Sequence, residues 1–230
     1  MIEKTLRTIT GEIRVRIPAS LNEVTLGQLM ALQERAELDD LDAIGILSGV
    51  PKPELANVKN FDELSAFGEH ILILSEQIRH LYENDTIPRR VIFKIDEAEV
   101  KVDVIHNLSV EPAGAFMAAR EIIAEEINGF ISLYGDENWK DHFQPSLKAC
   151  CQVLAHYFFC RVTKKLYDEY EAEAFSEEIK KLGVLEVLPI ARHFFTCYPN
   201  LSKPRTGFWH QFQQFWKKRR VSMLLKSLNT

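Results

Sequence analysis

Residues 11–34 read GEIRVRIPASLNEVTLGQLMALQE, and residues 98–121 read AEVKVDVIHNLSVEPAGAFMAARE. The two stretches align without gaps at an offset of 87 positions, the separation of Leu21 from Leu108. Each begins with alternating apolar and polar residues, which is the period of a half-buried strand, and continues into a helix-like segment. Over residues 20–34 and 107–121 the identical pairs are Leu21 and Leu108, Gly27 and Gly114, Met30 and Met117, Ala31 and Ala118, and Glu34 and Glu121. This shared order of strand, turn and helix indicates an internal duplication.

Turn and capping residues place the ends of these elements. Thr10-Gly11 and Asp96-Glu97 separate pairs of strand-like runs, so each unit is expected to begin with a β-hairpin. Thr25 and Gln28 have the spacing of a capping box at the start of a helix. In the second unit Pro112 is expected at the first helical position, where a missing N–H does least harm.

Further helices are expected in both units. The first unit continues with a short apolar helix over 41–50, ended by Pro51 and Pro53, and a helix over 61–82. The second continues with helices over 145–160, near 171–182 and over 184–197. The segment LYGDENWKDHFQ (133–144) is interpreted as a loop. The inward stripe of the 61–82 helix is Leu64, Phe67, Ile71, Leu74 and Ile78.

The sequence therefore predicts a mostly helical α+β protein built from two related units of a hairpin followed by helices. The expected divisions are residues 1–85, residues 90–203 and a C-terminal helix over 204–230. The composition ENDTIPRR near 83–90 is that of a linker between the two units.

Composition narrows the class of protein. Hydrophobic residues make up 46% of the 230 residues and charged residues 27%, which is ordinary for a globular chain with a core. No apolar run approaches the roughly 20 residues of a membrane helix, and the first ten residues lack the apolar region of a secretory signal. The four cysteines are therefore expected to be reduced thiols, as is usual in the cytoplasm.

No arrangement of residues indicates catalysis or a metal. Cys150, Cys151 and Cys160 with His156 match no zinc spacing, and core packing is the expectation for them and for His193. Gly-rich phosphate loops, nucleophile elbows and metal-binding helix motifs are absent from the sequence. Acid pairs such as Asp39-Asp40, Glu125-Glu126 and Glu177-Glu178 are neighbours in sequence, which do not face each other on a helix. We expect no enzyme, cofactor or metal.

Charge is distributed unevenly. The whole chain carries −5, but residues 204–230 contain six basic residues and no acid, which leaves −11 for residues 1–203. Within this C-terminal segment, aromatic residues follow helical spacing and basic residues cluster after them. The segment is therefore predicted to be an amphipathic helix that contacts a partner. The expected partner-binding residues are Phe208, Trp209, Phe212, Phe215, Trp216, Lys217, Lys218, Arg219 and Arg220.

Three destinations are open for this helix. It can pack on the acidic body of its own chain, dock on a partner or neighbouring subunit, or bind an anionic membrane or nucleic acid. A body that carries −11 repels phosphate, which disfavours nucleic acid, and no membrane association is expected. A groove for a client is expected between the hairpins and the helices that follow them, with exposed aromatic side chains contributing contact area.

Two parts of the chain resemble morphogenesis proteins of tailed bacteriophages, especially tail assembly chaperones. The first is IPASLNEVTLGQLMALQE (17–34) with AIGILSGVPKPEL (43–55), and the second is AHYFFCRVTKKLYDEYEAEAFSEEIKKLGVLEVLPIARHFFTCYP (155–199). In the second, the resemblance rests on Tyr167-Asp168-Glu169, Phe175, the run 182–188 and Phe194-Phe195. The likeness covers residues 11–60 and 153–200.

The resemblance implies a non-enzymatic role in the host cytoplasm. Such chaperones bind tail tube subunits and the tape-measure protein, and leave before the particle is complete. The duplication and the basic, aromatic C-terminal segment depart from the simplest chaperones. They leave open a permanent ring or connector subunit of the neck or tail in the virion, a homo-oligomer in which that segment contacts a neighbour or a portal component.

Overall fold

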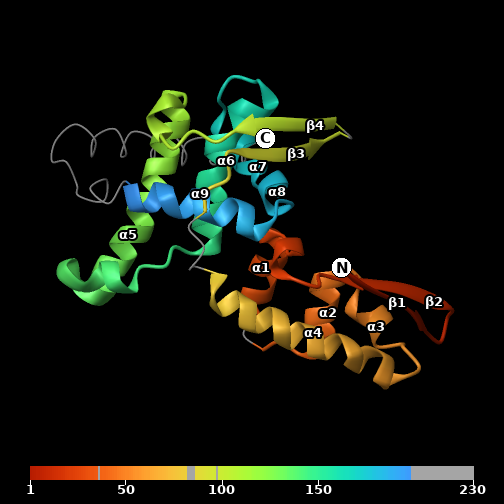
Figure 1. Cartoon of the computed structure of the whole chain (residues 1–230). Helices are drawn as coiled ribbons and strands as arrows, with labels where there is room; N and C mark the ends of the chain where they lie inside the picture. Colours follow the sequence, from red (N-terminus) through yellow and green to blue (C-terminus); the bar gives the residue numbers. More distant parts are fainter. Residues whose placement is uncertain (36, 82–85, 97, 198–230) are drawn as a thin grey trace, which may run out of the picture.

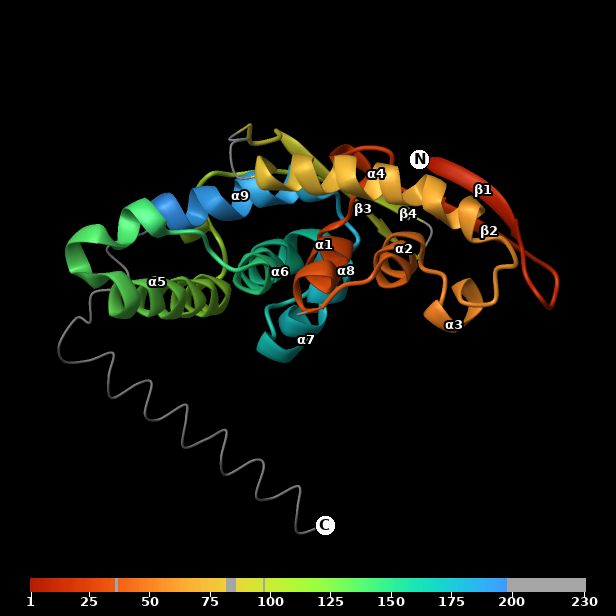
Figure 2. The same cartoon turned by 90° about the horizontal axis from the view of Figure 1, so that it is seen from below.

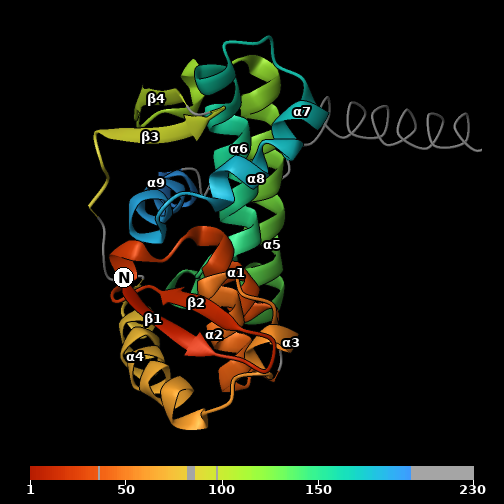
Figure 3. The ribbon, with the colours of Figure 1, turned by 90° about the vertical axis from the view of Figure 1, so that its right-hand side faces the viewer.

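The computed structural model describes residues 1–35, 37–81, 86–96 and 98–197, and all structural statements below refer to these residues. It confirms the expected α+β class, with two antiparallel hairpins that are each followed by helices (Figure 1). The hairpins lie at opposite ends of the molecule, with α9 and α1 between them (Figure 3).

The first unit contains one hairpin and four α-helices. β1 and β2 pair from Ile2↔Ile17 to Arg7↔Glu12, and their inward side chains Leu6, Val15 and Ile17 are buried. The capping box is confirmed: the backbone N–H of Gln28 donates to Thr25 Oγ1 at 3.2 Å, and that of Thr25 donates to Gln28 Oε1 at 2.9 Å. The elements are β1 (Ile2–Arg7), β2 (Glu12–Ile17), the 3-10 helix η1 (Leu21–Glu23), α1 (Leu26–Gln33), α2 (Asp40–Ser48), α3 (Lys52–Leu55) and α4 (Phe61–Arg79).

The second unit starts in the same way. β3 and β4 pair from Arg90↔Asp103 to Ile95↔Ala98, and η3 begins 87 positions after η1, as α5 does after α1. This agreement between the two halves supports the duplication. The elements are β3 (Arg90–Ile95), β4 (Ala98–Asp103), η3 (Leu108–Val110), α5 (Ala113–His142), α6 (Leu147–Thr163), α7 (Glu169–Ala174), α8 (Ser176–Lys180) and α9 (Val184–Cys197).

Three local expectations were wrong. The supposed loop over 133–144 is mostly helical, because α5 bends at Gly135 (φ 82°, ψ 161°) and then continues to His142. The helix expected near 171–182 is two short helices that meet at Phe175, whose buried ring packs against Phe93 and Phe159. Pro112 is the N-cap of α5 and precedes its first helical residue.

Helix α6 is the centre of the core. Twelve of its seventeen residues are buried, including Cys150, Cys151 and His156, as expected for a helix that is apolar all round. It packs against α5, α7, α8 and α9 of its own unit and against α1 of the first unit, so buried side chains of both units form one cluster. The expected division near residues 84–89 falls between α4 and β3, and stays a prediction.

Gly27 and Gly114, the glycines that the two repeats share, lie in the first turns of α1 and α5. Each first turn comes close to a segment of the second unit. A Cβ at Gly27 would lie 2.9 Å from Lys180 Cβ, and one at Gly114 would lie 2.5 Å from the ring of Tyr167. The identity of Gly27 and Gly114 in the sequence thus reflects one requirement met twice, a close approach of the first helical turn to a neighbouring segment.

Candidate functional site

The expected partner-binding residues, Phe208 to Arg220, lie outside the described residues. The described chain ends at Cys197, the last residue of α9. Candidate sites are therefore sought on the surface that residues 1–197 present, outside the three short gaps.

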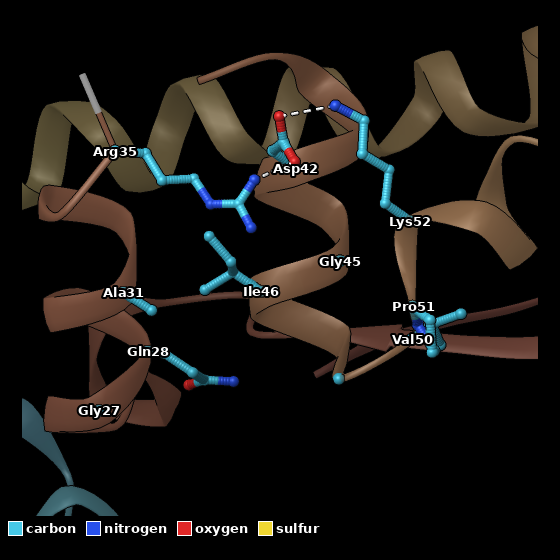
Figure 4. A pocket seen from close by; sticks show the side chains of 11 residues that line it. Gly27, Gln28, Ala31, Arg35, Asp42, Gly45, Ile46, Val50, Pro51 and Lys52 are labelled. Atoms are coloured by element: carbon cyan, nitrogen blue, oxygen red, sulfur yellow. Dashed lines mark hydrogen bonds and ion pairs between the residues drawn. The ribbon is translucent and has the colours of Figure 1, made fainter. Parts of the chain in front are cut away.

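An open hollow lies between α1, α2 and the turn that leads into α3 (Figure 4). Its volume is about 450 Å³, and its walls are mostly small or apolar. The polar side chain of Gln28 is already engaged, because its Nε2 donates to the Leu47 carbonyl at 2.8 Å and its Oε1 accepts from Thr25. The lining residues are Gly27, Gln28, Ala31, Arg35, Asp42, Gly45, Ile46, Gly49, Val50, Pro51 and Lys52.

Ion pairs at the rim of this hollow join three helices. The buried Asp42 pairs with Arg35, two residues after the end of α1, and accepts from Lys52 Nζ at 2.8 Å. Lys52 also reaches Asp39 at 2.6 Å, and Asp39 caps α2 by accepting from the backbone N–H of Asp42 at 2.7 Å. The hydrogen bond from Lys52 lowers the pKa of Asp39, and the same bond raises the pKa of Lys52. Two cations and two anions satisfy each other, so this network fastens α1, α2 and α3 together.

Buried polar pairs in the second unit also have structural roles. Glu111 forms an ion pair with Arg161 of α6, and the Arg161 guanidinium lies 5.0 Å from the centre of the Tyr157 ring. The Tyr157 hydroxyl accepts from the Ile105 N–H at 2.7 Å and donates to the Ile105 carbonyl at 2.9 Å, which fixes the chain as it leaves β4.

His156 is a core residue, as expected. It is 3% exposed, its Nδ1 lies 3.0 Å from the Tyr167 hydroxyl, and burial lowers its pKa to about 4. His193 is half-buried beside His106, with 5.1 Å between ring centres. Cys160 is half-buried and Cys197 exposed, and the described residues contain no group of histidine, cysteine and acidic side chains suited to a metal ion.

The groove expected between hairpins and helices is filled. Val91 and Phe93 of the second hairpin are buried, and the Phe93 ring lies 5.1 Å from that of Phe158 on α6. The first hairpin is packed in the same way by Leu6 and Val15. These inner-face side chains of both hairpins therefore belong to the core.

A second surface is formed by the bend of α5, residues 130–143, which we call the α5 elbow. After Gly135 the chain turns back toward the end of α9 (Figure 2). The Trp139 ring packs on that of Phe143, and the rings of Phe143 and Phe195 of α9 are 5.9 Å apart. Two large apolar side chains are exposed on the outside of the elbow: Leu133 is 77% exposed, and Tyr134 is 43% exposed and stacks on His142.

Helix α5 is acidic along its second half. Residues 121–142 contain six carboxylates and one lysine, a formal charge of −5 with histidine neutral. Within the elbow itself Asp136, Glu137, Asp141 and Lys140 are exposed, which gives the elbow a charge of −2. Among the described residues, other strongly exposed apolar side chains include Ile9 in the first hairpin turn, Leu72 on α4 and Leu166 before α7. The elbow differs from them because it combines exposed apolar groups, clustered rings and negative charge at the point where the described chain ends.

Sequence reasoning missed both the elbow and the ion-pair network. The signal for the elbow was present in Trp139 and Phe143, two large apolar residues in a segment otherwise composed like a loop.

Comparison of the chain with protein-family models, curated proteins and solved structures found no match. Within the described residues, no helix combines the length and apolar character needed to cross a bilayer.

Proposed function

We propose that this chain is a non-enzymatic assembly protein of a tailed bacteriophage, of the tail assembly chaperone type. It binds tail tube or tape-measure proteins in the host cytoplasm through its basic, aromatic C-terminal segment. The proposal rests on the resemblance of residues 11–60 and 153–200 to such proteins, and on the charge of the chain.

The two stretches of resemblance lie together in the fold. The backbone N–H of Leu26 donates to the Leu182 carbonyl at 2.9 Å, and that of Val184 donates to the Val24 carbonyl at 2.9 Å. The first turn of α1 and the start of α9 are thereby joined. The two stretches that carry the resemblance therefore meet at this point of the fold.

The observation that carries the binding role is the opposition of charge. Residues 204–230 carry six basic residues, no acid and the aromatic residues Phe208, Trp209, Phe212, Phe215 and Trp216. Aromatic side chains with adjacent basic groups are typical anchors of protein interfaces. An acidic body with such a segment is suited to holding a partner through a small contact while its own surface repels other acidic chains.

The first test is removal of residues 207–230. The full chain and the truncated chain are each co-expressed with the tail tube and tape-measure proteins of the same phage, and soluble complexes are isolated by a tag on this chain. We expect both chains to unfold cooperatively at similar temperatures, and only the full chain to retain a partner. Loss of cooperative unfolding on truncation would mean that the segment completes the core, and the docking role would be abandoned.

A second measurement separates a chaperone from a virion component. Quantitative mass spectrometry counts this chain against the major capsid protein in purified particles and in lysate. A chaperone is abundant in the lysate and absent from particles. A fixed number per particle, on the order of a dozen as ring closure suggests, would instead identify a permanent ring or connector subunit.

A further inference from the structure

We propose that the C-terminal segment, residues 204–230, docks on the α5 elbow of its own chain and covers it until a partner takes its place. The inference depends on the proposed function only in treating this segment as a docking element. It names the surface that the segment occupies when no partner is bound.

The elbow lies beside the end of the described chain. Phe195, two residues before Cys197, packs on Phe143 of the elbow, with ring centres 5.9 Å apart. Six residues, 198–203, separate that end from the basic segment, and a chain of this length spans at most about 20 Å. A connection this short gives an effective concentration in the millimolar range. The segment of the same chain is therefore favoured over that of a second copy.

The chemistry of the two surfaces is complementary. The elbow, residues 130–143, carries −2 with histidine neutral, and the preceding residues 121–129 of α5 add three carboxylates and no cation, whereas residues 204–230 carry six basic groups with no acid. Leu133 and Tyr134 expose apolar surface in the same stretch as Asp136 and Glu137, and the segment supplies five aromatic side chains. Burial of aromatic rings on an apolar surface supplies binding energy, and opposite charge at the rim fixes the orientation.

The elbow is also built as a fixed platform. Gly135 adopts a φ of 82°, which sets the bend, and Trp139 is 6% exposed below it. The rings of Phe130, Tyr134 and Phe143 form a connected cluster, with Phe130 at 6.0 Å from Tyr134 and 5.0 Å from Phe143 between centres. An exposed Leu133 on such a packed base is a surface that can bind a segment without rearranging.

The test is the rate at which trypsin cleaves within the basic run 217–220 of the full chain. When the segment must undock before trypsin can cut it, the cleavage rate is the rate for the free segment multiplied by the fraction of molecules that are undocked. We expect cleavage about tenfold or more slower than in the free peptide 204–230, as the population argument implies. The slowing should not change with protein concentration, and should weaken as salt is raised.

Matched variants localise the contact. Leu133→Ser and Glu137→Gln on the elbow should accelerate this cleavage several-fold. Leu72→Ser and Glu69→Gln, the same changes on exposed positions of α4, should leave it unchanged. Mass spectrometry identifies the cleaved bonds, and circular dichroism confirms that each variant is folded.

Two results would overturn the proposal. The first is cleavage as fast as in the free peptide, or equally affected by elbow and α4 variants. The second is protection that grows with protein concentration, which would place the segment on a second copy. Either result leaves the proposed function testable, because capture of tail proteins is measured with a different assay.

Discussion

The two repeated glycines lead to a sharp prediction. Replacing glycine by alanine within a helix normally stabilises it by up to about 1 kcal/mol, because alanine restricts the unfolded chain. At Gly129, also in α5, a Cβ would meet nothing within 4 Å, so Gly129→Ala should show this gain. At Gly114 the same change puts a Cβ 2.5 Å from the Tyr167 ring, far inside the usual contact distance of about 3.5–4.0 Å.

The cost at Gly114 follows from what holds Tyr167. Its hydroxyl is hydrogen-bonded to the buried His156 at 3.0 Å, so the ring cannot move by about 1 Å without weakening that bond. Overpacking of this kind costs about 1–3 kcal/mol, and a lost hydrogen bond costs about 1 kcal/mol. Against the alanine gain, we expect Gly114→Ala to lower the free energy of unfolding by about 1–3 kcal/mol.

Thermal unfolding followed by circular dichroism measures the difference. In a chain of this size each kcal/mol shifts the midpoint by about 2–4 °C. Gly114→Ala should therefore melt several degrees below the parent, and Gly129→Ala at or above it. In a Tyr167→Leu background the cost of Gly114→Ala should largely disappear, because the ring that it meets is gone.

The refuting result is equally plain. If both alanine variants melt at or above the parent temperature, the first turn of α5 does not approach Tyr167. The explanation of the repeated glycine would then fail. An unchanged cost in the Tyr167→Leu background would place the strain elsewhere.

Three further changes test other parts of the structure. Burial lowers the pKa of His156 to about 4 in the folded state, so the unfolded chain binds more protons than the folded chain between about pH 6.5 and 4. The free energy of unfolding should therefore fall by up to about 3 kcal/mol as the pH is lowered through that range. Urea titrations at pH 7 and 4.5 should show a smaller fall for His156→Gln, and an equal fall would contradict the assignment. Arg161→Met leaves the buried Glu111 without its cation and should destabilise by about 3–5 kcal/mol, while Arg161→Met with Glu111→Leu should recover most of it. Recovery is read from the urea midpoint, and a double variant no better than Arg161→Met would rule out the ion pair as the cause. Gly135→Ala places a side chain at φ 82° and ψ 161°, a region that essentially only glycine occupies, and should lower the free energy of unfolding by about 1–3 kcal/mol. Hydrogen exchange of this variant should show faster opening in residues 130–143 than in α6, and a uniform change would contradict a local bend.

The local sequence was sufficient where one element depends on its own residues. The alternation in residues 13–17 and 100–104 marks one strand of each hairpin because one face of each strand is buried. The Thr25 cap was predictable because both of its hydrogen bonds are made with Gln28, three residues further along the chain. The identical glycines were visible in the alignment, although their reason was not, since Lys180 and Tyr167 approach only in the folded chain.

Sequence reasoning failed where distant residues decide the structure. Arg161 and Glu111 are fifty positions apart, and nothing in either neighbourhood indicates that they meet. Residues 133–144 were interpreted as a loop, whereas most of them are helical, with Trp139 buried and packed on Phe143. A groove for a client was expected between hairpins and helices, but the strands turn one face to the helices. Core side chains of α6 cover that face in the second unit.

The duplication separates what the fold needs from what this chain adds to it. Both units share the hairpin, the 3-10 helix and a helix start that approaches its neighbour through glycine, so these parts are accounted for by packing. The two helices then diverge: α1 is eight residues long and ends at Gln33, whereas α5 is thirty residues long and bends at Gly135. The first unit has no counterpart of this extension among its described residues. The shared core therefore does not explain the exposed Leu133 and the carboxylates of this extension, and a surface that packing does not require is where a contact with another segment is best sought.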